Sequence, residues 1–257
     1  MRSFLVKSDM AYEYSFASVY DKFTEDVNYG ERAEYICTLL RENGIESGIL
    51  LDAACGTGSL SEIFLKKGFE VIANDISYEM LNIAREKLSS FGDKVLLMCQ
   101  DMCELDLYGT VDCAVCSLDS INHLLLEEDV NAAFESIGRF IRPGGIFIFD
   151  VNTVYKHREI ISDRTFVYED DTSVLVWQNS ECDETDTVEM YIDIFSKKEN
   201  GMYSRMSDCV TERAYSVDAI SQMLQNNGFD ILNIYGDTDF SAPKDDEERI
   251  YFLARKK

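Results

Sequence analysis

The segment Leu51 to Gly58, L-D-A-A-C-G-T-G, places a carboxylate beside glycines at a spacing suited to ligand binding. Asp52 follows an apolar stretch that begins at Ile49, and Gly56 and Gly58 come shortly afterwards. Glycine tolerates positive φ and lets a ligand lie against bare main chain. Ligands of open α/β sheets bind just outside the carboxyl ends of the strands. The segment therefore predicts a buried strand followed by a ligand-binding turn.

A dinucleotide site is the main alternative for this turn. Nicotinamide dinucleotides favour G-x-G-x-x-G, but Gly58 is followed by Ser59, Leu60 and Ser61, so the third glycine is missing. A pyrophosphate also needs an uncrowded helix N-terminus, and Asp52 adds negative charge nearby. An ordinary strand–turn–helix with no ligand is the other alternative.

A second apolar stretch, F-E-V-I-A-N-D, ends at another carboxylate, Asp75. Both segments resemble motifs of the class I S-adenosylmethionine (SAM)-dependent methyltransferases. In that family the first glycine turn holds the methionine part of SAM, with the acidic group near its amino group. The stretch R-F-I-R-P-G-G-I-F-I-F-D, which ends at Asp150, also resembles this family. The resemblance implies SAM as cofactor and S-adenosyl-L-homocysteine as product.

The resemblance also implies which residues contact the cofactor. Asp75 would accept hydrogen bonds from both ribose hydroxyls, Ile76 and Met80 would border the adenine, and Asp101 would meet its exocyclic amine. The segment F-A-S-V-Y-D-K-F resembles the opening helix that closes over SAM, which assigns Tyr20 to the cofactor and to catalysis. The expected cofactor contacts are Tyr20, Asp52, Ala53, Ala54, Gly56, Gly58, Asp75, Ile76, Met80, Asp101, Met102 and Ser117.

His123 is the candidate catalytic base, because histidine is suited to proton transfer near neutral pH. It lies in S-I-N-H-L, which resembles a stretch of bacterial amino-sugar N-methyltransferases. The alternative is a histidine that packs or begins the next helix. We expect His157 on the surface, and Asp150 and Asn152 are candidates to line the acceptor pocket.

The amino-acid composition limits the classes of molecule that the chain is expected to bind. The net charge is −24, with 48 acidic and 24 basic residues, which disfavours nucleic acid as a partner. No apolar run is long enough to span a membrane, and the opening segment has too short an apolar core for a signal peptide, so we expect a cytoplasmic protein.

Cys113 and Cys116 have the spacing of a metal or redox site. However, V-D-C-A-V-C is typical of a buried strand that points them to opposite faces, so we expect reduced thiols and no metal.

The predicted fold is α/β, with a seven-stranded, doubly wound, mostly parallel sheet and an inserted antiparallel sheet. N-terminal helices and the SAM-binding core would occupy 1–163, the insert 164–213, and a helix with the last two core strands 214–257. In the insert, Met190, Ile192 and Ile194 would share the packed face, opposite Tyr191 and Phe195. The R-P-G-G segment is predicted to be a turn. The insert is interpreted as a lid over the acceptor or a dimerisation flap.

These interpretations predict a SAM-dependent methyltransferase that acts on nitrogen or oxygen of a small molecule. The chain lacks the D-P-P-Y and Pro-Cys motifs of DNA-methylating enzymes. Two alternatives stay open. One is a protein methyltransferase, and the other is a non-catalytic methyltransferase-like module that binds SAM or a partner.

Overall fold

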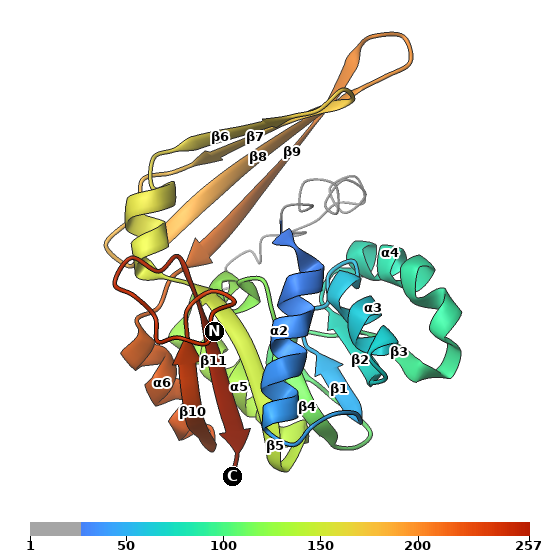
Figure 1. The fold of residues 1–257 in the computed structure, drawn as a ribbon. Helices are drawn as coiled ribbons and strands as arrows, with labels where there is room; N and C mark the ends of the chain where they lie inside the picture. Colours follow the sequence, from blue (N-terminus) through green and yellow to red (C-terminus); the bar gives the residue numbers. More distant parts are fainter. Residues whose placement is uncertain (1–26) are drawn as a thin grey trace, which may run out of the picture.

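The computed structural model describes residues 27–257, which form two separate β-sheets (Figure 1). The larger sheet has seven strands in the order β10-β11-β5-β4-β1-β2-β3. The five strands β5, β4, β1, β2 and β3 are parallel to one another. Strand β11 runs antiparallel to both of its neighbours, β5 and β10. This confirms the predicted mostly parallel sheet. Its strands are β1 (Ile49–Asp52), β2 (Glu70–Asp75), β3 (Val95–Cys99), β4 (Val111–Cys116), β5 (Ile141–Asn152), β10 (Phe229–Tyr235) and β11 (Arg249–Lys256).

Helices cover both faces of this sheet, so its central strands are apolar on both sides. Residues of α2, α3 and α4 share one hydrophobic core with the sheet, and residues of α5 and α6 share the other. Cys113 lies in the first core and Cys116 in the second, as the alternation of β4 predicts. The helices are α2 (Tyr29–Glu42), α3 (Ser59–Lys66), α4 (Tyr78–Leu88), α5 (Glu127–Phe140) and α6 (Val217–Asn226).

Side-chain caps begin α2, α4 and α6, and serines supply the caps of the last two. Ser77 Oγ accepts a hydrogen bond from the Met80 N–H at 3.2 Å, and Ser216 Oγ accepts one from the Ala219 N–H at 3.2 Å. Each bond satisfies a donor that the first helical turn leaves free. The Ser77 cap matters most for function, because it begins α4 directly after β2. None of the described helices is long and apolar enough to cross a membrane.

The second sheet has four antiparallel strands, β6 (Thr165–Glu169), β7 (Ser173–Asn179), β8 (Thr187–Lys197) and β9 (Tyr203–Arg213). Figure 1 shows it standing over the end of the larger sheet from which β5 emerges. Met190 and Ile194 are buried on its inner face, whereas Tyr191 is exposed, so the predicted division of faces is confirmed. Met80 of α4 packs in one cluster with Leu175 and Ile194. The second sheet therefore contacts the core at α4, far from its attachment to β5.

The R-P-G-G segment does not end the strand pairing. These residues belong to β5, whose register against β4 shifts between Val111 and Cys113. Gly144 has a φ of 78°, and a Cβ on Gly145 would lie 2.6 Å from the Asp112 carbonyl oxygen. The four residues have no partner in either neighbouring strand, so the predicted turn is present as a bulge inside β5 and does not precede the strand.

Candidate active site

The turn after β1 lies where the sequence predicts it, and its two glycines have different surroundings. Gly56 and Gly58 have φ of 53° and 79°. No atom of residues 27–257 lies within 4 Å of a Cβ built on Gly56, so among these residues this side of the turn faces open space. A Cβ on Gly58 would lie 3.2 Å from the side chains of Ala84 and Leu88. Gly56 therefore leaves room for a ligand, and Gly58 allows α3 to pack closely on α4.

Asp52, at the end of β1, is a buried carboxylate that accepts a hydrogen bond from Ser61 Oγ at 2.6 Å and has no cationic partner within 27–257. Burial raises its pKa to about 7; the charge of Asp75 adds to this rise, and the Ser61 bond opposes it. A buried carboxylate without a cationic partner is costly to ionise. The position of Asp52 beside the Gly56 turn thus suits a ligand that carries positive charge.

Asp75, at the end of β2, connects the turn to α4. Its Oδ2 accepts a hydrogen bond from the Gly56 N–H at 2.7 Å, and its Oδ1 accepts one from the Ser77 N–H at 2.8 Å. Burial raises the pKa of Asp75, and the two backbone hydrogen bonds oppose that rise. Each carboxylate oxygen retains a lone pair that a ligand hydroxyl can use.

Asn74 is a structural part of the site that the sequence reasoning missed. Its Nδ2 donates to the carbonyl oxygens of Ala53 and Gln100, both at 3.0 Å, and its Oδ1 accepts from the Gln100 N–H at 3.1 Å. It thereby joins the segments that follow β1 and β3. The signal was a polar amide inside an otherwise apolar strand, since such a group is buried only when hydrogen-bonded.

The residues predicted to contact the adenine differ in how exposed they are and in what they contact. Ile76 is 66% exposed, whereas Met80 is 2% exposed and packs beneath the second sheet. Asp101 Oδ1 accepts a hydrogen bond from the Cys103 N–H at 2.9 Å, which caps the short turn η3 (Met102–Glu104). Met102 is partly buried against the core on the α5 side. Met80 is therefore also a contact between the core and the insert.

Ser117 follows β4 and is buried, but its Oγ has no hydrogen-bond partner among the described residues. The next residues, Leu118 and Asp119, have φ of 59° and 54°, which is unusual for residues with a side chain. An unpaired buried hydroxyl is rare unless something else supplies its partner. Together with Asp52 and the open space at Gly56, this hydroxyl fits a ligand with both positive charge and polar groups, as SAM has.

A buried ionic cluster continues from this point across β5 and β11. Asp150 accepts hydrogen bonds from the backbone N–H groups of Leu118 at 2.9 Å and Asp119 at 3.1 Å. Arg249 pairs with Asp150 and, at 2.8 Å, with Asp119. Burial alone would raise the pKa of Asp119, but the charges of Arg249 and Lys156 hold it well below its usual range. The cluster fixes the strained segment after Ser117.

Asp150 and Asn152 were candidates to line the acceptor pocket, but both are buried among protein partners. Asn152 Nδ2 donates to Asp119 Oδ2 and to Glu212 Oε2, each at 3.0 Å. Its Oδ1 accepts a hydrogen bond from Lys156 Nζ at 2.9 Å. These side chains hold the elements of the rim together.

His123 ends the short helical turn η4 (Ser120–His123), and its side chain is 34% exposed. Its Nε2 lies 3.9 Å from Glu212 Oε1, on the last strand of the second sheet. Sequence reasoning missed Glu212, although its position matches the inward-facing side of β9 that includes the buried Val210. An acidic residue on such a face was the available signal.

The prediction that His157 lies on the surface is wrong, because its side chain is fully buried. It lies in η5 (Lys156–Ile161), which follows β5 and is covered by the second sheet. Its Nδ1 is 2.9 Å from the Asp186 carbonyl oxygen, and its Nε2 is 3.6 Å from Glu212 Oε2. Tyr20, the other predicted catalytic residue, lies outside the described residues.

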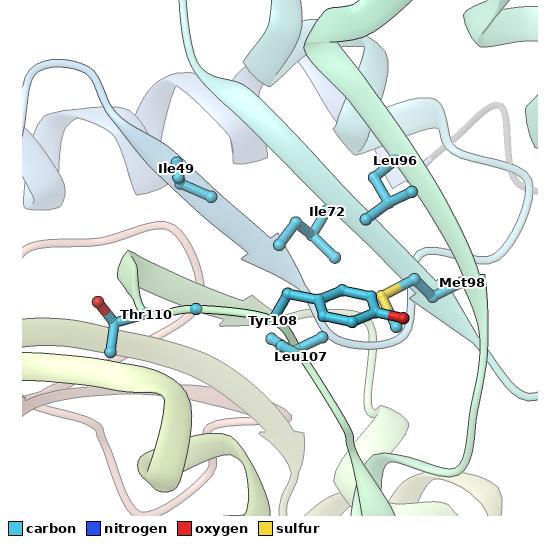
Figure 2. Close-up of a pocket in the computed structure, with 8 residues that line it drawn as sticks. Ile49, Ile72, Leu96, Met98, Leu107, Tyr108 and Thr110 are labelled. Carbon is cyan, nitrogen blue, oxygen red and sulfur yellow. The ribbon is translucent and has the colours of Figure 1, made fainter.

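A hollow of about 110 Å³ lies elsewhere, on the sheet face beside the connection from β3 to β4. Figure 2 shows its apolar lining, contributed by three strands and by the segment 107–110. It includes none of the predicted site residues. The candidate active site is instead the rim at the carboxyl ends of β1, β2 and β4, where the fold brings Asp52, Gly56, Asp75, Ser117 and His123 together.

The fold and this rim define an α/β protein with a ligand site at the carboxyl ends of its parallel strands. Comparison with known proteins gives the family. Residues 50–145 match a family profile described as a methyltransferase domain. The protein YqeM of Bacillus subtilis (strain 168) is 35% identical over 94% of this chain and 96% of its own length.

Solved structures agree with this match. A SAM-dependent methyltransferase from Clostridium acetobutylicum is 33% identical, with a TM-score of 0.86 over 94% of this chain and 98% of that one. DesVI of Streptomyces venezuelae, at 22% identity, shares the fold with a TM-score of 0.79 over 96% of this chain and 100% of its own. The chain belongs to the SAM-dependent methyltransferases, and SAM is its cofactor.

Proposed function

We propose that this methyltransferase acts on nitrogen or oxygen of a small-molecule acceptor, with nitrogen favoured. The observation that carries the proposal is a partly exposed histidine, His123, beside a cofactor rim built from Gly56, Asp52 and Asp75. Related enzymes support it. A dTDP-amino-sugar N,N-dimethyltransferase of Streptomyces venezuelae is 31% identical over 54% of this chain, and a glycine/sarcosine N-methyltransferase of Parasynechococcus marenigrum is 31% identical over 51%.

In this proposal the rim residues bind and orient the cofactor. Asp52 places negative charge near its amino group, and Asp75 accepts hydrogen bonds from its ribose. Ser117 Oγ gains the partner that it lacks among the described residues. When bound, SAM supplies an electrophilic methyl group on a positively charged sulfur. The chain then has to hold the acceptor in line with that methyl group and exclude water.

The acceptor side of the proposal rests on His123. A protonated amine or a hydroxyl must lose a proton as its lone pair bonds to the methyl carbon, and His123 is placed to receive it. The second sheet is proposed as a lid that excludes water and selects the acceptor. Its packing on Met80 supports this, because Met80 belongs to α4, which begins directly after β2 at the rim. The exposed outer face, with Tyr191, is the surface that a homodimer would use.

The test is release of S-adenosyl-L-homocysteine by the purified full chain, measured across separate panels of amines, amino sugars, amino acids, hydroxylated metabolites, peptides and nucleic acids. We expect turnover with a small amine or hydroxyl compound. Turnover confined to peptides would favour the protein-methylating alternative. Tight SAM binding with no turnover in any panel would favour a non-catalytic module. Nucleic acid is the least favoured substrate, because acidic residues outnumber basic ones 48 to 24.

A further inference from the structure

The chain has two histidines, and both face the same buried carboxylate. Glu212 Oε1 lies 3.9 Å from His123 Nε2, and Glu212 Oε2 lies 3.6 Å from His157 Nε2. Glu212 is buried at the end of β9, whereas the histidines follow β4 and β5. A buried carboxylate needs such cationic or hydrogen-bonding partners to remain ionised. The insert therefore contributes a charge to the site proposed for proton transfer.

Hydrogen bonding defines the orientation of His157. Its Nδ1 is 2.9 Å from the Asp186 carbonyl oxygen, which can only accept, so Nδ1 carries a proton. Its Nε2 then faces Glu212 Oε2 at 3.6 Å and makes no hydrogen bond with the described residues. His157 thus packs against one side of the Glu212 carboxylate. Asn152 Nδ2 donates a hydrogen bond to Oε2 at 3.0 Å and holds the carboxylate in place.

The segment that carries His123 is attached directly to the strand that carries Glu212. Asn122, the residue before His123, is fully buried. Its Nδ2 donates to the carbonyl oxygens of Asn152 at 3.1 Å and Arg213 at 3.0 Å. Its Oδ1 accepts from the Asn152 N–H at 2.9 Å. These bonds hold η4, β5 and the end of β9 in one arrangement, so the spacing of His123 and Glu212 is set by buried contacts.

We propose that Glu212 is a positioning residue that orients His123 and stabilises its protonated form. The inference rests on the proposed function and adds the insert as a structural part of the acceptor site. With Nε2–H directed toward Glu212, the other ring nitrogen presents its lone pair to the acceptor. His123 makes no hydrogen bond with the described residues, and in this proposal Glu212, 3.9 Å away, is the ion-pair partner that orients it.

The proton and electron pairs balance in the proposed step. The acceptor lone pair forms the bond to the methyl carbon, and the carbon–sulfur pair returns to sulfur. The acceptor proton moves to the free nitrogen of His123, and the negative charge of Glu212 offsets the resulting imidazolium before the proton passes to water. Other charged groups also act on this pair: Asp75 and Asp119 lie near His123, and Lys156 lies near Glu212. Because they remain unchanged in a Glu212 variant, the effect of Glu212 can be separated from theirs.

The first test needs neither SAM nor an acceptor. The ring C–H signals of His123 and His157 are followed by NMR between pH 5 and pH 9 in the full chain, and a His123→Gln variant assigns them. In Glu212→Gln, we expect the His123 ring signals to change at a lower pH than in the wild type, since a negative charge 3.9 Å away is lost. Glutamine can still accept the hydrogen bond from Asn152. Glu189→Gln, on the exposed face of the same sheet, is the matched control and should leave the midpoint unchanged.

The second test uses an acceptor found in the panels. Glu212→Gln should lower kcat by about tenfold or more, with little change in KM for SAM. The rise of the rate with pH should move toward acid by the same amount as the NMR midpoint. Glu212→Asp, which keeps the charge, should fall between the Gln variant and the wild type in both measurements. If Glu212→Gln does not fold, as judged by circular dichroism, the Asp variant alone must show a smaller shift in the same direction.

An unchanged His123 midpoint in a folded Glu212 variant overturns the proposal, whatever its activity. An unchanged pH–rate profile with lowered activity also overturns it, because that result indicates a purely structural role. Failure to find any acceptor would contradict the proposed function but leave the NMR result intact. The two failures are therefore distinguishable.

Discussion

The Gly56 N–H donates a hydrogen bond of 2.7 Å to Asp75 Oδ2. This bond joins the turn after β1 to the end of β2, so the two acidic motifs form a single site. It also gives Asp75 a structural task besides its proposed contact with the ribose. Variants at this position must therefore be tested for folding before a change in affinity is interpreted.

Replacing Asp75 tests the proposed ribose contact. We expect Asp75→Ala to weaken SAM binding by about 2–4 kcal/mol, because two charge-assisted hydrogen bonds are lost. Isothermal titration calorimetry measures the loss, and circular dichroism checks that the variant is folded. An unchanged dissociation constant in a folded variant would exclude the assignment.

Gly56 offers a test of where the cofactor lies. Gly56→Val should abolish SAM binding while the fold is largely retained, because the side chain would occupy the open space beside the turn. Gly92→Val is the matched control. Gly92 also has positive φ, 60°, and no atom within 4 Å of a built Cβ, but it precedes β3 at the other end of the sheet. Equal loss of SAM binding in both variants would point to backbone strain instead of a blocked ligand.

The raised pKa of Asp52 predicts a pH-dependent affinity. Its value of about 7 lies above the usual 3.8, so the protein without SAM binds a proton that a cationic ligand must displace. SAM affinity should therefore rise with pH, by about fivefold between pH 6 and pH 7, and the raised pKa of Asp75 acts in the same direction. Calorimetry at several pH values checks this. Asp52→Asn should bind SAM more weakly and with a flatter pH dependence; a flat wild-type profile would contradict the prediction.

The same shift affects stability. Asp52 holds its proton more tightly in the folded than in the unfolded chain, so the free energy of unfolding should fall as pH rises from about 4 to 7. The upper limit for this one group is about 4 kcal/mol, from roughly three pH units. Urea unfolding of the SAM-free protein measures it. Asp52→Asn should lose less stability over this range than the wild type; equal losses would show that Asp52 is ionised in both states.

His123→Ala should lower turnover by about 10²–10⁴-fold and leave SAM affinity nearly intact, because a general base acts on the acceptor and not on the cofactor. Steady-state kinetics and calorimetry give the two quantities. A loss of less than tenfold would restrict His123 to packing or orientation. A parallel loss of SAM affinity would instead indicate that the rim itself had been disturbed.

A partial replacement of the insert tests the lid. Deleting all of 164–213 would remove the partners of Asn152, Asn122 and His157, so a Gly/Ser linker should replace 191–208 only, which removes Ile194 and retains Asp186, Glu212 and Arg213. We expect this variant to bind SAM but not to methylate the acceptor. Full activity in a monomeric variant would exclude the lid. Loss of dimerisation alone, seen by size-exclusion chromatography, would support a dimerisation flap.

Much of the fold could be predicted from local pattern. Apolar runs ending in Asp52 and Asp75 predicted neighbouring parallel strands, and the alternation around Met190 predicted which face of the insert is packed. These inferences succeeded because the period of a strand and the chemistry of a turn depend on residues close together in the chain. The Gly56 turn could be predicted for the same reason. So could the orientation of Cys113 and Cys116 toward opposite faces of the sheet.

The convergence of His123, His157 and Glu212 depended on the tertiary structure. Each lies after or within a different strand, and no local spacing relates them. His157 was expected on the surface, yet the insert covers it. Met80 likewise meets Ile194 only because the second sheet packs on α4. Sequence alone determined the cofactor turn and the sheet, whereas the partners of the proposed base were decided by the packing of strands that are distant in the chain.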